Sequence, residues 1–130
     1  MSRVIHFEIH AEDVPRAVAF YQKALGWTSQ DFSEYAGSPY FGMTTGSDGA
    51  GIDGAVMQRT GPNPEPGGVI VGAVLTAGVE DFDAAAAAIE DAGGLVALPK
   101  FALPGMAWQG YFIDTEGNVF GIHQPDPAAA

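Results

Sequence analysis

The stretch at positions 5–26 reads IHFEIHAEDVPRAVAFYQKALG, and it returns in altered form at positions 73–94 as AVLTAGVEDFDAAAAAIEDAGG. The two copies align at a constant offset of 68 residues, which places Asp13 on Asp81 and Gly26 on Gly94. An internal repeat of this length predicts two similar modules packed face to face, with a cavity between them.

Each copy reads as a strand followed by a helix. From position 4 to position 10 apolar and polar residues alternate, which predicts a strand with one apolar and one polar face. The polar face carries His6, Glu8 and His10. Asp13 is a favourable helix N-cap and Gly26 a favourable helix end, and Asp81 occupies the same capping position in the second copy. The alignment places Val74 where the first copy has His6, so the two modules differ at this point.

Three further strand patterns follow each helix, so each module is predicted to be βαβββ and the fold class α+β. The first module spans 1–60, and a linker at 61–68 holds three prolines and three glycines. The second module spans 69–124, with strands expected at 69–77, 95–98, 106–113 and 118–124. Residues 125–130 are expected to form a loose tail.

The charge balance excludes several classes of partner. The chain has 130 residues, a formal net charge of −11 and only five Lys and Arg residues. Nucleic acid and anionic membranes need a basic surface, so we expect neither as a partner. A cationic ligand would be attracted. There is no cysteine and no apolar run of about 20 residues, so we expect a cytoplasmic protein that does not cross a membrane.

The order of these motifs resembles the vicinal oxygen chelate superfamily, which includes the glyoxalase, bleomycin-resistance and extradiol dioxygenase families. The motifs are the first strand with its histidine, the run from Asp13 to Trp27, and the closing DTEGN at 114–118. The resemblance covers nearly the whole chain. It implies two βαβββ modules whose curved mixed sheets form a cup, and a homodimer in which modules are sometimes exchanged.

The same resemblance implies four metal ligands in enzymes such as glyoxalase I, and three of them are missing here. The first falls on His6 and matches. The others fall near Val56, on Val74 and on Gly121, and none of these side chains binds a metal. We therefore expect no metal and no cofactor, and metal-dependent glyoxalase or dioxygenase activity is not expected. Whether the protein is an enzyme stays open.

Candidate ligand-binding residues follow from the faces of the strands. We assume that the turn at 114–117 pairs residue 113 with residue 118. Gly110 then faces Gly121, and Trp108 faces His123, inside the cup. The predicted ligand-binding residues are His6, Glu8, Phe41, Met57, Met106, Trp108, Gly121 and His123. The acidic residues Asp114 and Glu116 are assigned to the turn.

Three functions remain open at this stage. The first is a protein that binds or sequesters an aromatic or cationic small molecule without a metal. The second is a metal-independent lyase, isomerase or hydrolase with His6 as general base. The third is a metalloenzyme with a rearranged site built from His6, Glu8, His10 and His123.

Overall fold

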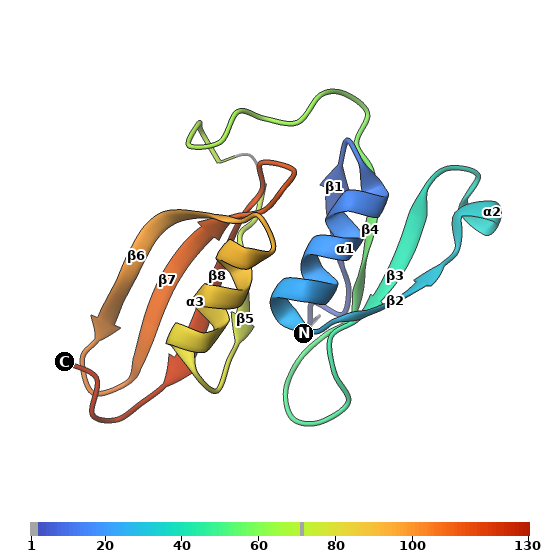
Figure 1. Cartoon of the computed structure of the whole chain (residues 1–130). Helices are drawn as coiled ribbons and strands as arrows, with labels where there is room; N and C mark the ends of the chain where they lie inside the picture. Colours follow the sequence, from blue (N-terminus) through green and yellow to red (C-terminus); the bar gives the residue numbers. More distant parts are fainter. Residues whose placement is uncertain (1–2, 71) are drawn as a thin grey trace.

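The computed structural model describes residues 3–70 and 72–130, and it folds them into two four-stranded sheets with the two longer helices packed between them (Figure 1). The first sheet has the order β1-β4-β3-β2 and the second the order β5-β8-β7-β6. In each sheet the first strand pairs in parallel with the last, and the other pairings are antiparallel. Two βαβββ modules with mixed sheets, and the α+β class, are thereby confirmed.

Apart from the short helix α2 of the first module, the elements follow one another in the same order in both modules. The first module contains β1 (Phe7–Ala11), α1 (Val14–Leu25), β2 (Thr28–Asp31), α2 (Ser33–Ala36), β3 (Tyr40–Thr44) and β4 (Gly54–Gln58). The second contains β5 (Leu75–Gly78), α3 (Phe82–Asp91), β6 (Leu95–Leu103), β7 (Ala107–Ile113) and β8 (Val119–Pro125). The short helix α2 has no counterpart in the sequence prediction.

The repeated helices begin where the aspartates predict. The Asp13 carboxylate accepts a hydrogen bond of 3.0 Å from the backbone N–H of Arg16, and Asp81 accepts one of 3.1 Å from Ala84. Such caps satisfy backbone donors that the first helical turn leaves unpaired. Gly26 ends α1 with a φ of 73°, a left-handed conformation that suits glycine.

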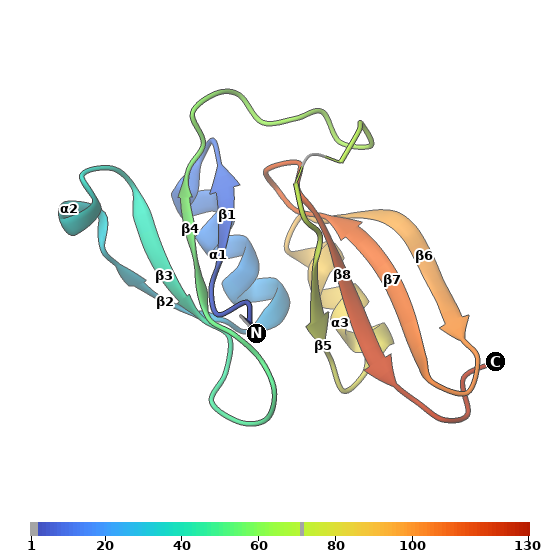
Figure 2. The ribbon, with the colours of Figure 1, turned by 180° about the vertical axis from the view of Figure 1, so that it is seen from behind.

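Helices α1 and α3 pack against each other and form the centre of the molecule (Figure 2). Each sheet turns one face toward them, which we term the helix face. Ile9, Val56, Phe112 and Phe120 lie on these helix faces and are buried with Tyr21 of α1. The opposite face of each sheet is termed the open face, because no helix covers it (Figure 2).

Three predicted segments differ from the structure. The strand expected at 95–98 continues to Leu103. The strand expected at 69–77 is confined to Leu75–Gly78, and Val71 lies outside the described residues. The loose tail predicted for 125–130 is wrong, because Ala129 is only 3% exposed and its carbonyl accepts a hydrogen bond from Gly105. The boundaries at 60 and 69 stay predictions. In the described part of the chain, no helix has both the length and the apolar character needed to span a membrane.

The hairpin between β7 and β8 differs by one residue from the predicted register. Ile113 pairs with Val119, because the backbone N–H of Asp114 donates to the carbonyl of Asn118 and lengthens the loop. A shift of one residue turns every side chain to the opposite face. Tyr111 therefore pairs with Gly121, and Gln109 pairs with His123.

Candidate functional site

The corrected register removes Trp108 from the open face. Trp108 pairs with Gln124 and packs beside the core, with its ring 4.7 Å from the ammonium of Lys100. Its indole N–H donates to Asp126 at 3.0 Å. The placement of Trp108 opposite His123 is thus wrong. Gly110 is likewise on the helix face, against the ring of Phe82.

Two other predicted binding residues also lie away from the open faces. Phe41 pairs with Val56 on the helix face of the first sheet and packs against the core. Met106 is 62% exposed in the turn between β6 and β7. The open faces carry the remaining predicted residues: His6, Glu8, Met57, Gly121 and His123.

A cluster of three polar side chains lies on the open face of the first sheet. The Tyr40 hydroxyl donates to Oε2 of Glu8 at 3.0 Å and lies 3.3 Å from Nε2 of His6. His6 Nε2 is 3.7 Å from the same carboxylate oxygen. Because the hydroxyl proton is given to Glu8, the contact with His6 requires Nε2–H as donor, which leaves Nδ1 as an acceptor. Burial and the bond to Glu8 raise the pKa of Tyr40.

The open face of the second sheet is apolar and hollowed. The hollow has a volume of about 630 Å³. It is lined by Gly67, Gly68, Ile70, Val74, Thr76, Val96, Ala97, Leu98, Tyr111, Ile113 and Val119. We term it the apolar hollow. Leu98 is 48% exposed at its edge. Solvent-exposed apolar surface of this kind is typical of a binding surface.

Gly121 makes room for neighbouring side chains on this open face. A Cβ atom there would lie 2.9 Å from Nε2 of Gln109, 3.0 Å from the Thr76 hydroxyl and 3.0 Å from the Tyr111 ring. Gln109 is 5% exposed, and its Oε1 is 2.8 Å from Nδ1 of His123. Since an amide oxygen only accepts, His123 donates from Nδ1 and keeps Nε2 as an acceptor.

The polar cluster and the apolar hollow are not parts of one cavity in a single chain. Strands β1 and β8 run in opposite directions (Figure 1), and the Asn118 amide before β8 donates to the carbonyl of His10 at the end of β1. His6 lies at the other end of β1, whereas Val74 precedes β5 near the start of β8. The hollow is lined by the second sheet, the linker, and Ile70 and Val74 of the segment between the linker and β5.

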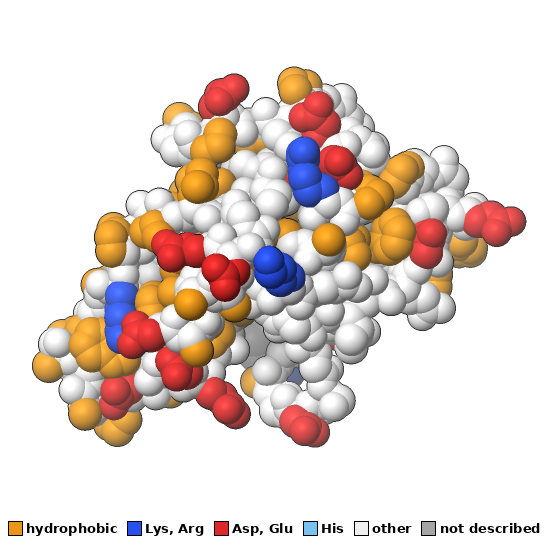
Figure 3. Space-filling view, in the orientation of Figure 1, with side chains coloured by type: hydrophobic (Ala, Val, Ile, Leu, Met, Phe, Trp, Pro, Cys, Tyr) orange, Lys and Arg blue, Asp and Glu red, His pale blue; other side chains and the backbone are white. Residues whose placement is uncertain are grey.

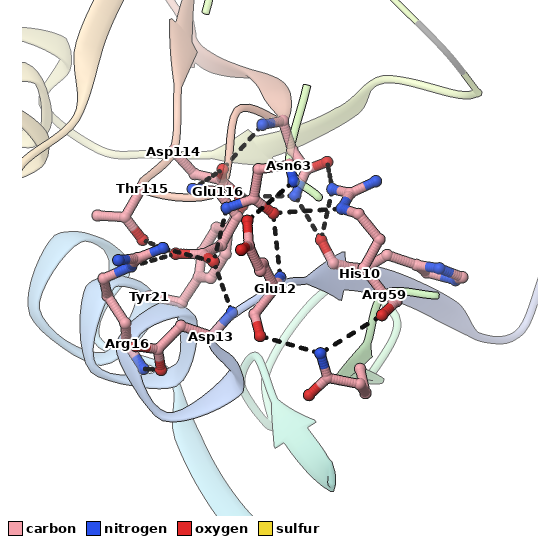
Figure 4. Close-up of polar contacts among 12 residues, drawn as sticks. His10, Glu12, Asp13, Arg16, Tyr21, Arg59, Asn63, Asp114, Thr115 and Glu116 are labelled. Atoms are coloured by element: carbon pink, nitrogen blue, oxygen red, sulfur yellow. Dashed lines mark hydrogen bonds and ion pairs between the residues drawn. The ribbon is translucent and has the colours of Figure 1, made fainter. Parts of the chain in front are cut away.

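The contacts between the two modules form a polar network that the sequence did not reveal (Figure 4). Its centre is Glu116, whose side chain is 0% exposed. The Glu116 carboxylate accepts hydrogen bonds from Arg16 at 2.7 Å and 3.1 Å, from the backbone N–H of Asp13 at 3.0 Å and from Asn63 of the linker at 3.0 Å. It joins α1, the linker and the last hairpin. Glu116 therefore has a structural role.

The protonation of this network follows from burial and hydrogen bonding. Burial would raise the pKa of Glu116, but the hydrogen bonds from Arg16, Asp13, Asn63 and Thr115 lower it to about 2. Burial raises the pKa of Asp114, and this effect is larger than the opposing effect of its hydrogen bonds, which lower the pKa. Burial also raises the pKa of Tyr21 well above its usual value. Glu116 is thus ionised at neutral pH.

A family model gives the first comparison with known proteins. The model of the bleomycin resistance protein-like N-terminal region matches residues 3–38. No curated protein matches the sequence significantly.

The match covers β1, α1, β2 and α2, and the structure adds the other strands of the first module and the whole second module. The chain has the fold of the vicinal oxygen chelate superfamily. Solved structures with this fold resemble it over nearly their whole length. FosX, a fosfomycin resistance protein from Listeria monocytogenes, has a TM-score of 0.73 and 16% identity, covering 97% of this chain and 93% of its own.

Two other similar structures come from different bacteria. A glyoxalase/bleomycin resistance protein/dioxygenase family enzyme from Burkholderia phytofirmans has a TM-score of 0.68 and 19% identity, with 93% of this chain and 97% of that chain covered. An integron cassette protein from Vibrio cholerae has a TM-score of 0.66 and 22% identity, with 95% of each chain covered. At these identities the likeness shows the fold.

The residues of this chain do not fit the metal site of the superfamily. A variant of the Listeria FosX was crystallised with Mn(II). Here the open-face positions of β4 are Ala55 and Met57, while Val56 is buried on the helix face. Val74 and Gly121 offer no ligand atom. In residues 3–70 and 72–130, no three His, Asp or Glu side chains lie together as a metal site would require.

The rearranged site built from His6, Glu8, His10 and His123 is likewise not formed within one chain. His6 and Glu8 contact Tyr40 on the first sheet, whereas His123 contacts Gln109 on the second. The two parts of that set lie on different sheets.

Proposed function

We propose that the protein binds a small organic molecule with an apolar body and a cationic group, without a metal. The apolar hollow supports this proposal, because it offers an exposed apolar surface that includes Val74, the position to which the superfamily resemblance assigns the third metal ligand. The first sheet offers Glu8, whose carboxylate is held in place by the Tyr40 hydroxyl. Acidic side chains outnumber basic ones over the face in Figure 3, which favours a cationic ligand.

The working form in this proposal is a homodimer. Within one chain the Glu8 cluster and the apolar hollow face different spaces, so a ligand that contacts both requires a second copy. The first sheet of one chain would then face the second sheet of its partner. Each dimer would hold two such sites.

The binding of proflavine, a flat cationic aromatic compound, tests this proposal by titration calorimetry. We expect saturable binding to the wild type. Glu8→Gln should weaken it by roughly threefold to tenfold, the effect of one partly exposed charge pair. Leu98→Arg should abolish it by placing a cation in the hollow. Glu90→Gln, on the exposed side of α3, is the matched control and should bind normally. Absence of saturable binding of any cationic aromatic compound would overturn the proposal.

Mixing the two defective variants tests the shared site. When Glu8→Gln and Leu98→Arg chains are co-expressed, a dimer of one chain of each kind has one site with both defects and one intact site. Such a mixture should regain wild-type affinity in a fraction of its sites. If each site lay within one chain, no intact site would form and affinity would not return.

The position of His6 favours a second candidate, catalysis with His6 as general base. Its Nε2–H is directed to Tyr40, which leaves Nδ1 free to accept a proton from a ligand. Ligands found by calorimetry should be incubated with the protein and the products sought by mass spectrometry. Turnover that persists in a folded His6→Ala variant would rule out this role.

A further inference from the structure

We propose that a second site, in the cleft between the two modules on the helix side of the sheets, binds a flat aromatic carboxylate. The cleft has a volume of about 380 Å³, within the range of small-molecule sites. Both modules line it. Its main apolar residues are Phe7, Tyr21, Trp27, Leu75, Ala77 and Phe120.

This cleft and the apolar hollow lie on opposite sides of the second sheet and share one lining residue, Thr76 of the edge strand β5. Phe7 pairs with Gly54 and Leu75 with Phe120 on the helix faces of their sheets, opposite to Glu8 and Val74. The edge strand β5 contributes Thr76 and Gly78 at the opening. The inference therefore does not rest on the proposed function.

Four of the residues that line the cleft are aromatic. The rings of Tyr21 and Trp27 are stacked, with centroids 4.9 Å apart and planes 12° apart. Phe7 lies 5.5 Å from Trp27 in a tilted arrangement. Tyr21 and Phe120 are buried, whereas Phe7 and Trp27 are only partly buried and keep surface toward the cleft. A planar ring is favoured in contact with such surfaces.

The charge at the cleft favours an anion. Arg3 is among the residues that line the cleft. The other four cations of the chain are engaged: Arg16 with Glu116, Lys100 with Asp83, Arg59 with Asn118, and Lys23 with the carbonyl of Asp91. Among residues 3–70 and 72–130, Arg3 makes no hydrogen bond or ion pair. A guanidinium that is not already engaged by a neighbouring side chain can bind a carboxylate through two parallel hydrogen bonds.

Tryptophan fluorescence tests the site directly. The chain has two tryptophans, so Trp108→Phe leaves Trp27 as the single reporter. In this background, 2-naphthoate should change the Trp27 emission saturably. Adding Arg3→Ala should weaken 2-naphthoate binding about tenfold, the effect of one charge-assisted contact, and leave neutral 2-naphthol unaffected. Adding Ala77→Leu should fill the cleft and abolish the binding of both compounds.

Control variants separate this site from the apolar hollow and from a dimer contact. Leu98→Arg should leave 2-naphthoate binding unchanged, and a loss there would place the probe in the hollow and overturn the proposal. Circular dichroism should show that each variant is folded. Absence of a saturable change at Trp27 would also overturn it. If sedimentation shows that Ala77→Leu converts a dimer to monomers, a second copy covers the cleft and the proposal is wrong.

Discussion

The Tyr21 hydroxyl donates a hydrogen bond of 2.6 Å to Oδ2 of Asp114, between residues that are 93 positions apart and both buried. It joins helix α1 of the first module to the last hairpin of the second. Asp114 uses its other carboxylate oxygen to accept from the backbone N–H groups of Glu116 and Asn118, which fixes the loop.

Tyr21→Phe should lower the free energy of unfolding by about 1.5–3 kcal/mol at neutral pH, since it leaves a buried carboxylate with one donor fewer. Burial raises the pKa of Asp114. The contribution of Asp114 to the free energy of unfolding is therefore present at low pH and is lost as the pH rises through its pKa in the folded protein. Removing the Tyr21 bond raises this pKa further. The loss of unfolding free energy caused by Tyr21→Phe should therefore be larger at neutral pH than at pH 3. Urea unfolding at both pH values measures it. Tyr35→Phe, at a residue 95% exposed, should change nothing.

Glu116→Gln should destabilise the protein by about 2–4 kcal/mol at pH 7, because the amide cannot accept all the bonds that the carboxylate accepts. The pKa of Glu116 falls from 4.5 to about 2 on folding. A lowered pKa stabilises the fold above 4.5, and this contribution is lost as the pH falls toward 2. The difference between wild type and variant should shrink over that range. A difference that stays constant with pH would contradict an ionised Glu116.

Gly110→Ala and Gly121→Ala should differ in stability, and the difference tests the register of the β7–β8 hairpin. A Cβ atom on Gly110 would lie 2.6 Å from the buried ring of Phe82. The expected cost is about 1–3 kcal/mol. A Cβ atom on Gly121 meets mainly the ends of side chains on the open face, at 2.9 Å or more, and these can shift. Thermal unfolding should show the smaller loss for Gly121→Ala. The register predicted from the sequence would give both residues the same face.

Tyr40→Phe should weaken proflavine binding by about twofold to fivefold while changing stability little, because the hydroxyl holds Glu8 in place on a partly exposed surface. Tyr35→Phe again serves as the control in the same calorimetric titration. Equal affinities for Tyr40→Phe and wild type would show that Glu8 does not depend on this hydroxyl.

The repeat made the fold predictable from the sequence, because the features that repeat are local. An aspartate before a helix and a glycine after it act within one turn, and Asp13, Asp81 and Gly26 behave as predicted. The alternation of apolar and polar residues from position 4 to position 10 also placed His6 and Glu8 on the same face, which is the open face of the first sheet. Such signals do not depend on partners distant in sequence.

The candidate site was less predictable because it depends on register and on distant contacts. One extra residue in the 114–118 loop moved Trp108 to the helix face and brought Gln109 and Tyr111 to the open face. Glu116 resembles a solvated turn residue in the sequence, and its burial follows from Arg16 and Asn63, which are 100 and 53 positions away. No local pattern marks those contacts.

The Glu116 network also has a consequence for biosynthesis. The N-terminal end of α1 finds its carboxylate partner 100 residues later, near the end of the chain. As the polypeptide leaves the ribosome, the first module is complete in its own strands long before Glu116 is synthesised. Contacts of such high sequence separation form late and slow folding. We therefore expect that the duplicated halves do not fold as independent units, and that the first half reaches its final state only after the closing hairpin has been synthesised.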